Sequence, residues 1–237
     1  PIGYFGCPRQ NDFTSEPTHK ILRVIDDIPH IKKLGCNAVY FGPVFESSAH
    51  GYDTADYTKI DRRLGTNEDF KKVCDALHEN GIRVVLDGVF NHCGSFNKWM
   101  DRERIYEGEE DYEPGAYVSA DSPYRSYFRF FKEGPENWPY NGNYDGWWGH
   151  DTLPKLNYED SVKLENYILY IGRKWVSPPY NVDGWRLDVA ADLGHTPEYN
   201  HKFWKGFREA VKRENPEAII LAEHYGAVSY THLRAHE

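Results

Sequence analysis

Helical segments and short apolar runs alternate along this chain, and the alternation restricts its fold more than any other feature. Residues 18–34 carry apolar side chains at helical spacing, and the apolar run 37–43 follows them. A second helix, opening at Thr66, leads to the apolar run 82–87. Units of about thirty residues are typical of parallel βα pairs, so the alternation predicts an α/β fold.

Local signals refine these elements. Thr18 is the expected cap of the first helix, and Pro29 is expected to kink or break it. The polar stretch 50–57 is expected to be a loop. Residues 93–157 interrupt the rhythm: they are polar, aromatic and rich in Gly and Pro, and too long for an ordinary loop, so they predict a small subdomain. The alternation then resumes with a helix at 161–176, a short strand from 182, a helix at 197–214 and a strand at 218–223.

Charge and hydropathy exclude two classes of partner. The formal net charge is −9, from 28 Lys and Arg against 37 Asp and Glu, and the acidic residues are scattered. No basic stripe exists to neutralise phosphates, so we expect no nucleic-acid partner. No run approaches the roughly 18 apolar residues of a membrane span, so we expect no membrane partner. Because the chain starts with Pro1, the lack of a signal peptide says little; location stays open, with the cytoplasm favoured.

The cysteines indicate no metal or disulfide site, whereas the aromatic residues favour a neutral ligand. Cys7, Cys36, Cys74 and Cys93 are widely separated, which is typical of small buried residues and not of a zinc site or a disulfide framework. Aromatic residues make up 16% of the chain, with 18 Tyr and 7 Trp. Most should pack in the core, but a surplus of Tyr and Trp in polar sequence also suits stacking on neutral ligands such as sugars.

Three predicted strands end in polar residues: Asp87 with His92 just beyond, Arg186 with Asp188, and Glu223. Sites assemble at the carboxyl ends of parallel strands. Charged groups are rarely buried without a partner or a task, although a structural Arg–Asp pair remains an alternative. The strands of Asp188 and Glu223 are consecutive, so they should be neighbours about 4.8 Å apart. This is close to the ~5–5.5 Å between the two carboxyl groups of a retaining glycosidase.

Several short motifs resemble those of the α-amylase family, glycoside hydrolase family 13. The segments DGVFNH (87–92), GWRLD (184–188) and AE (222–223) resemble three of its signature regions. LPKLN (153–157) resembles a fifth, in the form typical of the cyclomaltodextrinase and neopullulanase branch, and GYDTADY (51–57) resembles the loop before the family's second helix. The resemblance covers residues 3–226.

The resemblance implies a (β/α)8 TIM barrel with a subdomain inserted after the third strand. Its barrel parts would be 1–92, with the end of strand one at residues 1–3, and 158–226, reaching strand five; the subdomain would be 93–157. We therefore expect about strands two to five of a barrel, without the family's third carboxylate. The tail 227–237 matches nothing expected and resembles translated adaptor read-through, so we expect a gene fragment that is not a working enzyme alone.

The resemblance also implies roles at the site. Asp188 takes the place of the nucleophile and Glu223 that of the general acid/base. Tyr52 takes the place of a tyrosine that stacks on the reacting sugar, and His92 that of a histidine bonding its hydroxyls. Arg186 would bind the substrate beside the nucleophile, and Asp87 would orient Arg186. The implied substrate is an α-glucan oligosaccharide, cut or transferred by double displacement; bond type, chain form and oligomeric state stay open.

One departure from typical α-amylases concerns calcium. Ala191-Asp192 stands where animal and fungal members carry Lys-His, which questions a lysine contact to the leaving group and part of a calcium site. No cofactor is expected to be required, and Asn91 is the candidate calcium ligand.

Two other function classes remain as alternatives. The chain could be a non-catalytic relative serving as a binding or chaperone subunit, although such relatives usually lose the nucleophile or the acid. A metal-dependent barrel enzyme could instead use strand-end side chains as ligands, namely Asp87, His92, Asp188 and Glu223. Arg186 beside Asp188 disfavours this reading, because a guanidinium repels a cation.

Overall fold

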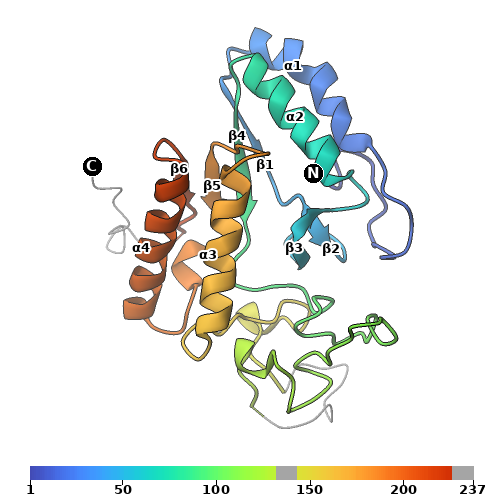
Figure 1. Cartoon of the computed structure of the whole chain (residues 1–237), viewed down its shortest axis with the longest axis vertical. Helices are drawn as coiled ribbons and strands as arrows, with labels where there is room; N and C mark the ends of the chain where they lie inside the picture. The colour runs from blue at the N-terminus through green and yellow to red at the C-terminus, as the bar shows by residue number, and fades with distance from the viewer. Residues whose placement is uncertain (132–142, 226–237) are drawn as a thin grey trace.

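Four parallel strands form the main sheet of the computed structural model, which describes residues 1–131 and 143–225. The strands lie in chain order: β1 (Ala38–Phe41), β4 (Arg83–Gly88), β5 (Gly184–Leu187) and β6 (Ile219–Ala222) (Figure 1). Sequential parallel pairing is the order of a βα barrel, so the expected partial α/β barrel is confirmed. The proposed tail 227–237 and residues 132–142 of the predicted subdomain lie outside the described residues.

Helix α1 (Arg23–Lys33) precedes the first parallel strand, and the other helices connect the strands. In the described part of the chain the connecting helices are α2 (Asn67–Glu79), α3 (Val162–Val176) and α4 (Pro197–Glu214). Short 3-10 turns are η1 (Lys20–Leu22), η2 (Arg125–Tyr127), η3 (Trp147–Gly149) and η4 (Ala190–Asp192). Helices α1 and α2 pack together, as do α3 and α4, and the described residues between β4 and α3 lie beyond the end of β4 (Figure 1).

Capping side chains explain where three helices begin. Thr66 and Asp69 form a reciprocal capping box at the start of α2, where the sequence predicted a helix to open. Ser161 accepts a bond from the third backbone N–H of α3, and Thr196 does the same for α4, where proline occupies the first position. Each cap satisfies a backbone donor that has no partner inside the helix.

Three expectations for the first forty residues are wrong. Thr18 does not cap a helix, because its hydroxyl donates to the carbonyl of Arg63 at 2.8 Å; the helical turns begin at Lys20. Pro29 lies inside α1 without ending it. Residues 1–3 are not the end of a strand, since the Phe5 N–H closes a local turn onto the Pro1 carbonyl at 3.1 Å.

The stretch 50–57 is also not loop throughout. Thr54 begins β3 (Thr54–Ile60), which pairs antiparallel with β2 (Phe45–Ser47). This hairpin was missed because the strand carries polar residues whose burial its sequence does not reveal: Thr54 is 1% exposed.

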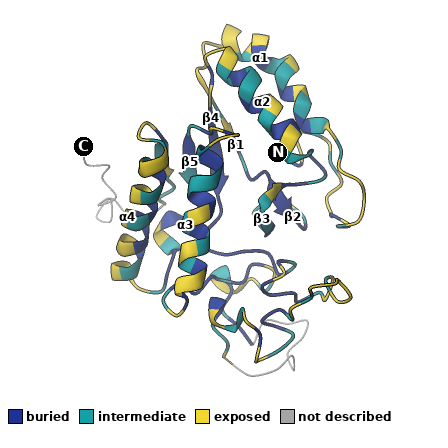
Figure 2. Cartoon of the chain, viewed as in Figure 1, coloured by how far each residue is buried: buried dark blue, intermediate teal, exposed yellow. Residues whose placement is uncertain are grey.

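The core lies between the sheet and the helices, and Figure 2 shows buried residues on the facing sides of both. Trp175 and Trp185 are fully buried, and their indole N–H groups donate to the carbonyls of Tyr57 at 3.0 Å and Gly172 at 3.1 Å. A Cβ at Gly172 would come within 2.6 Å of the Phe207 ring. Glycine there therefore allows α3 and α4 to pack closely.

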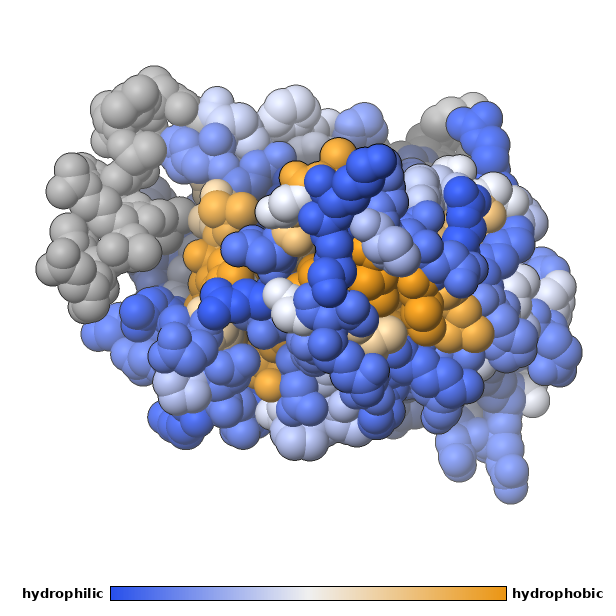
Figure 3. Space-filling view, turned by 90° about the horizontal axis from the view of Figure 1, so that it is seen from above, coloured by the Kyte–Doolittle hydropathy of each residue, from blue (hydrophilic) through white to orange (hydrophobic). Residues whose placement is uncertain are grey.

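The described strands form an open sheet. Strands β1 and β6 each pair on one side only, and side chains in both are exposed: 48% for Tyr40 and 59% for Leu221. Apolar surface also gathers between polar side chains on the face seen from above (Figure 3). Unpaired strand edges beside apolar surface are sites where another strand or chain can add.

Cysteine burial and helix hydropathy complete the description. Cys74 and Cys93 are buried as expected, whereas Cys36 is exposed, contrary to expectation. Within residues 1–131 and 143–225, no helix is both long enough and apolar enough to cross a membrane.

Candidate active site

Four charged side chains meet where β4, β5 and β6 end: Asp87, Arg186, Asp188 and Glu223, here called the site cluster. Arg186 is at its centre. Its Nη1 lies 2.9 Å from Asp87 Oδ1 and 2.7 Å from Asp188 Oδ1, and its Nη2 lies 2.8 Å from Glu223 Oε1. The expectation that polar strand ends converge is therefore met by direct ion pairs.

Strand register explains this convergence. Asp87 and Arg186 are cross-strand partners of β4 and β5, and neighbouring parallel partners point to the same face of the sheet. Leu187 pairs with Ala222, so the residues that follow them, Asp188 and Glu223, leave adjacent strands at the same level. The separation of about 5 Å between the two carboxyl groups stays a prediction.

The cluster contains one cation for three carboxylates. Burial raises the pKa of Asp188 to about 6; the bond from Arg186 opposes this rise, and the charges of Asp87 and Glu223 add to it. Burial also raises the pKa of Asp87. At pH 7 Asp188 is still ionised in most molecules, as a nucleophile needs to be.

Glu223 is held by two donors. Arg186 contacts Oε1, and the backbone N–H of Val189 donates to Oε2 at 2.8 Å. The side chain is 35% exposed, the most open of the site cluster. A general acid at this position must carry a proton, so Glu223 would have to give up at least one of these donors before it protonates a leaving group.

Tyr40 is a member of the site that sequence reasoning missed. Its hydroxyl donates to Asp87 Oδ2, and its ring centroid lies 6.0 Å from the Arg186 guanidinium carbon. It comes from β1, which the sequence shows only as an apolar run. A tyrosine inside such a run was the available signal, because its hydroxyl needs a polar partner.

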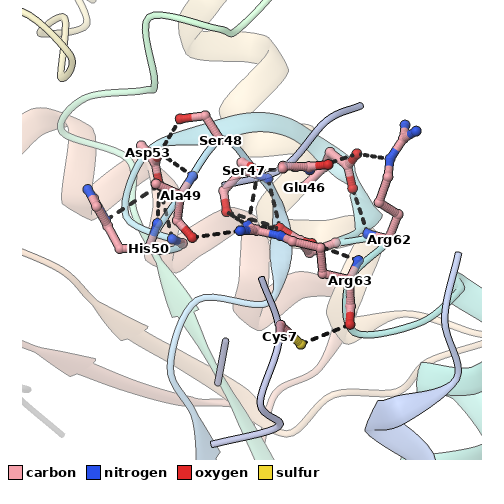
Figure 4. A network of polar contacts seen from close by, with 12 residues as sticks. Cys7, Glu46, Ser47, Ser48, Ala49, His50, Asp53, Arg62 and Arg63 are labelled. Carbon is pink, nitrogen blue, oxygen red and sulfur yellow. Dashed lines mark hydrogen bonds and ion pairs between the residues drawn. The ribbon is translucent and has the colours of Figure 1, made fainter. Parts of the chain in front are cut away.

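Tyr52 lies beside the site cluster. Burial raises the pKa of its phenol, and the charges of Asp87 and Asp188 act in the same direction, which places the phenol near both carboxylates. The loop carrying it is tied down by Asp53 (Figure 4). The Asp53 carboxylate accepts backbone N–H bonds from Ala49 at 2.7 Å, His50 at 3.1 Å and Gly51 at 3.0 Å.

His92 is buried, and both of its ring nitrogens have protein partners. Nε2 lies 3.1 Å from the Tyr52 carbonyl oxygen, and Nδ1 lies 3.1 Å from the Asn91 side-chain nitrogen. Burial lowers the pKa of His92 to about 4, so the ring is neutral at pH 7. A sugar hydroxyl could bind His92 only by replacing one of these partners, and that role stays a prediction.

The residues around Asn91 do not fit calcium. The Asn91 side-chain oxygen accepts a bond from Lys155 Nζ at 3.1 Å, and the same ammonium donates to the carbonyl of Asp192. The two oxygens thus already share a cationic group, which would repel a metal ion. In the part of the chain that is described, no group of three or more His, Cys, Asp and Glu could hold a metal.

Comparison with known proteins identifies the family. Residues 20–236 match the family described as alpha amylase, catalytic domain. The chain belongs to the α-amylase catalytic-domain family. It is 39% identical over 202 residues to a cyclomaltodextrinase of Bacillus sp. and 35% identical over 226 residues to an amylopullulanase of Thermoanaerobacterium saccharolyticum. These alignments cover 84% and 88% of the chain, and 32% and 16% of the relatives.

Solved structures agree with the family fold. The type III pullulan hydrolase from Thermococcus kodakarensis superimposes with a TM-score of 0.71 at 31% identity, over 86% of this chain and 32% of that one. The expected likeness to the cyclomaltodextrinase branch is confirmed by the match to a cyclomaltodextrinase. The chain spans a third or less of the length of the two curated relatives, and the roles of its site residues stay predictions.

Proposed function

We propose that this protein is a retaining glycoside hydrolase or transglycosylase that acts on α-glucan oligosaccharides by double displacement. Asp188 attacks the anomeric carbon while Glu223 donates a proton to the glycosidic oxygen, so the leaving sugar departs neutral. The glycosyl group is then esterified to Asp188. Glu223, now a carboxylate, takes a proton from water or from an acceptor sugar, which attacks the same carbon and releases Asp188.

The meeting of Asp188 and Glu223 on one guanidinium supports this proposal above all. Two carboxyl groups on adjacent strand ends can reach the same glycosidic bond, and Arg186 keeps a positive charge beside the carboxylate that must stay ionised. Asp87 and Tyr40 position Arg186 from the opposite side. The names of the relatives favour starch-like, pullulan-like or cyclic α-glucan substrates.

Proton NMR of the first-formed sugar tests the stereochemistry in the protein encoded by the complete gene. Double displacement predicts an α-anomeric product, and a first-formed β-anomer would disprove it. Labelling with a 5-fluoroglucosyl fluoride should add one glycosyl group to Asp188. A folded protein that binds maltooligosaccharides but is never labelled would favour the non-catalytic alternative. Activity that depends on a bound metal would favour the metal-dependent one.

A further inference from the structure

Two histidines hold the backbone of Tyr52, one at each end of the residue. The Tyr52 N–H donates to His50 Nδ1 at 3.2 Å, and the Tyr52 carbonyl oxygen lies 3.1 Å from His92 Nε2. An N–H group can only donate and a carbonyl oxygen can only accept, so the two ring nitrogens have opposite roles. His50 Nδ1 must be unprotonated, whereas His92 Nε2 must carry a hydrogen.

The two rings differ in their access to protons. His92 is 1% exposed, and burial lowers its pKa to about 4, so it stays neutral well below pH 7. The His50 side chain is 54% exposed and exchanges protons with solvent. Histidine is the side chain whose charge ordinarily changes between about pH 5 and 8. His50 is therefore the member of the pair that can change charge in this range.

Asp53 offers the protonated His50 ring a second partner. Its Oδ1 lies 3.4 Å from the same Nδ1 that accepts the Tyr52 N–H (Figure 4). Oδ1 is held in place because it also accepts the backbone N–H groups of His50 and Gly51. A protonated Nδ1 would donate to this oxygen and could no longer accept from Tyr52. Protonation of one nitrogen thus selects between two partners.

Other charged and titratable groups surround His50 in the described part of the chain. Its own loop contributes Asp53 and the Tyr52 phenol, whose ring lies 6.2 Å from the imidazole. His92 faces it from beyond the end of β4, and a charge on His50 opposes protonation of His92. Arg63, after β3, bonds the backbone of the same loop. Asp53 supplies the negative charge with which an imidazolium would pair.

The Tyr52 N–H follows a tight turn that leads into the site. Gly51 has a φ of 100°, and a Cβ there would come within 3.0 Å of the Pro43 ring, so the turn has little room to adjust. The Tyr52 phenol lies beside the carboxylates of Asp87 and Asp188. Loss of the bond to His50 leaves the Tyr52 backbone held at its carbonyl, and the ring loses one of its two fixed points.

We propose that His50 is a positioning residue that fixes the Tyr52 platform when its imidazole is neutral and releases it when the imidazole is protonated. The inference rests on the proposed function, in which Tyr52 stacks on the reacting sugar. It adds a pH control of sugar binding that is separate from the ionisation of Asp188.

Binding of maltotetraose to Asp188→Asn tests this inference in the protein encoded by the complete gene. Asp188→Asn stops turnover and removes the ionisation of Asp188 itself. Its Kd, measured by isothermal titration calorimetry, should rise about fivefold between about pH 7.5 and about pH 5.5, the effect of one neutral hydrogen bond. Adding His50→Asn should remove this rise, because an asparagine oxygen accepts the N–H two residues further on and does not titrate.

Two further variants in the same background complete the set. His50→Ala removes the acceptor at every pH, so Kd should be about fivefold higher already near pH 7.5 and should rise no further. His201→Asn removes an exposed imidazole of α4 and should leave the full pH dependence. Thermal melts at both pH values check that the variants are folded.

The outcomes separate this inference from the proposed function. The same pH dependence of Kd with and without His50→Asn would disprove the role of His50, since every other carboxylate titrates alike in the two proteins. A Kd of Asp188→Asn that does not change with pH would disprove it as well. A wild-type protein that binds maltotetraose but is never labelled by a 5-fluoroglucosyl fluoride would disprove double displacement, and the binding results would still decide the role of His50.

Discussion

Two ionic clusters of this molecule look alike in a list of contacts but differ in charge balance. The site cluster sets one arginine against three carboxylates at the strand ends. A second cluster, here called the hairpin network, lies at β2 and β3 and sets two arginines against two carboxylates: Glu46, Asp61, Arg62 and Arg63 (Figure 4).

Burial and bonding separate the two further. Arg63 is 5% exposed and Asp61 0%, and their ion pair measures 2.6 Å. The remaining N–H groups of Arg63 donate to backbone carbonyls, three of which belong to Pro8, Arg9 and Ala49 at 3.2, 3.0 and 2.9 Å. Arg186 is 16% exposed, and its ion pairs are with three carboxylates, those of Asp87, Asp188 and Glu223.

This difference distinguishes a structural cluster from a chemical one. The hairpin network is balanced in charge, and its central pair, Arg63 and Asp61, is buried and bonded to backbone carbonyls, so it fixes a loop. The site cluster keeps excess negative charge; burial raises the pKa of Asp188 to about 6, the neighbouring carboxylates add to the rise, and Glu223 is partly exposed. Perturbed carboxylates at an open strand end are the signature of a functional site.

The largest expected effect is the loss of the nucleophile. Asp188→Asn should lower kcat by roughly 10⁴-fold or more, because the amide cannot form the glycosyl ester. Glu223→Gln should lower turnover of maltooligosaccharides strongly but spare aryl glycosides with activated leaving groups, which need no proton. Steady-state rates on both substrate types decide this. Equal residual rates for the two variants on both substrates would remove the distinction between nucleophile and acid.

Replacing Arg63 or Arg186 with glutamine tests the comparison between the two clusters directly. Arg63→Gln should lower the free energy of unfolding by about 3–5 kcal/mol. It leaves Asp61 buried without its cation and several backbone carbonyls without a hydrogen-bond donor. Arg186→Gln should lower stability less, since Asp87 and Asp188 can take up protons once the cation is gone, yet it should abolish turnover. Denaturant unfolding and rate assays on both variants give the answer, with Lys71→Gln in an exposed pair as the control. A larger loss of stability for Arg186→Gln would invalidate the comparison.

Sequence reasoning found the site cluster but not the hairpin network. Asp87, Arg186 and Glu223 lie at or just after the ends of predicted strands, and parallel order brings such strand ends together. Arg63 and Asp61 follow a strand with polar side chains, and only tertiary structure shows that this strand is buried.

Residues that act through side-chain partners were hidden for a similar reason. Tyr40 contacts Asp87 from β1, and Lys155 contacts Asn91 from 64 residues further along the chain; no local pattern marks such contacts. The sequence could not show the ammonium beside Asn91, because the position of Lys155 depends on how residues 153–157 fold back onto the end of β4.

A third test uses pH. Because Asp188 must be ionised to attack, kcat/KM should fall as pH decreases through about 6. The free energy of unfolding should instead rise as pH decreases, because a carboxyl whose pKa is raised in the folded state stabilises the fold most when it is protonated. Its contribution, on the order of 3 kcal/mol, is present below about pH 4 and lost as pH rises to about 6.

Asp188→Asn separates these two pH effects. The variant cannot ionise, so it should unfold at a higher temperature than the wild type at pH 7 and show a flatter dependence of Tm between pH 4 and 6. Asp75→Asn, at an exposed carboxylate of α2, should leave the wild-type profile in place. A variant less stable than wild type at pH 7 would show that Arg186 outweighs the burial of Asp188.

The smallest expected effect concerns Tyr52, on the loop that joins the two clusters. As a platform for the reacting sugar, Tyr52 should tolerate Phe, whereas Tyr52→Ala should weaken transition-state binding by roughly 1–3 kcal/mol through lost burial and stacking. Asp53 is anchored beside the hairpin network, so the loop should stay folded in Tyr52→Ala and Tm should change little. Rates and thermal melts on Tyr52→Phe, Tyr52→Ala and the wild type measure both quantities. A lower Tm with unchanged kcat/KM in the folded fraction would make Tyr52 a packing residue. Tyr52 would then belong with the structural residues of the hairpin network and not with the site cluster.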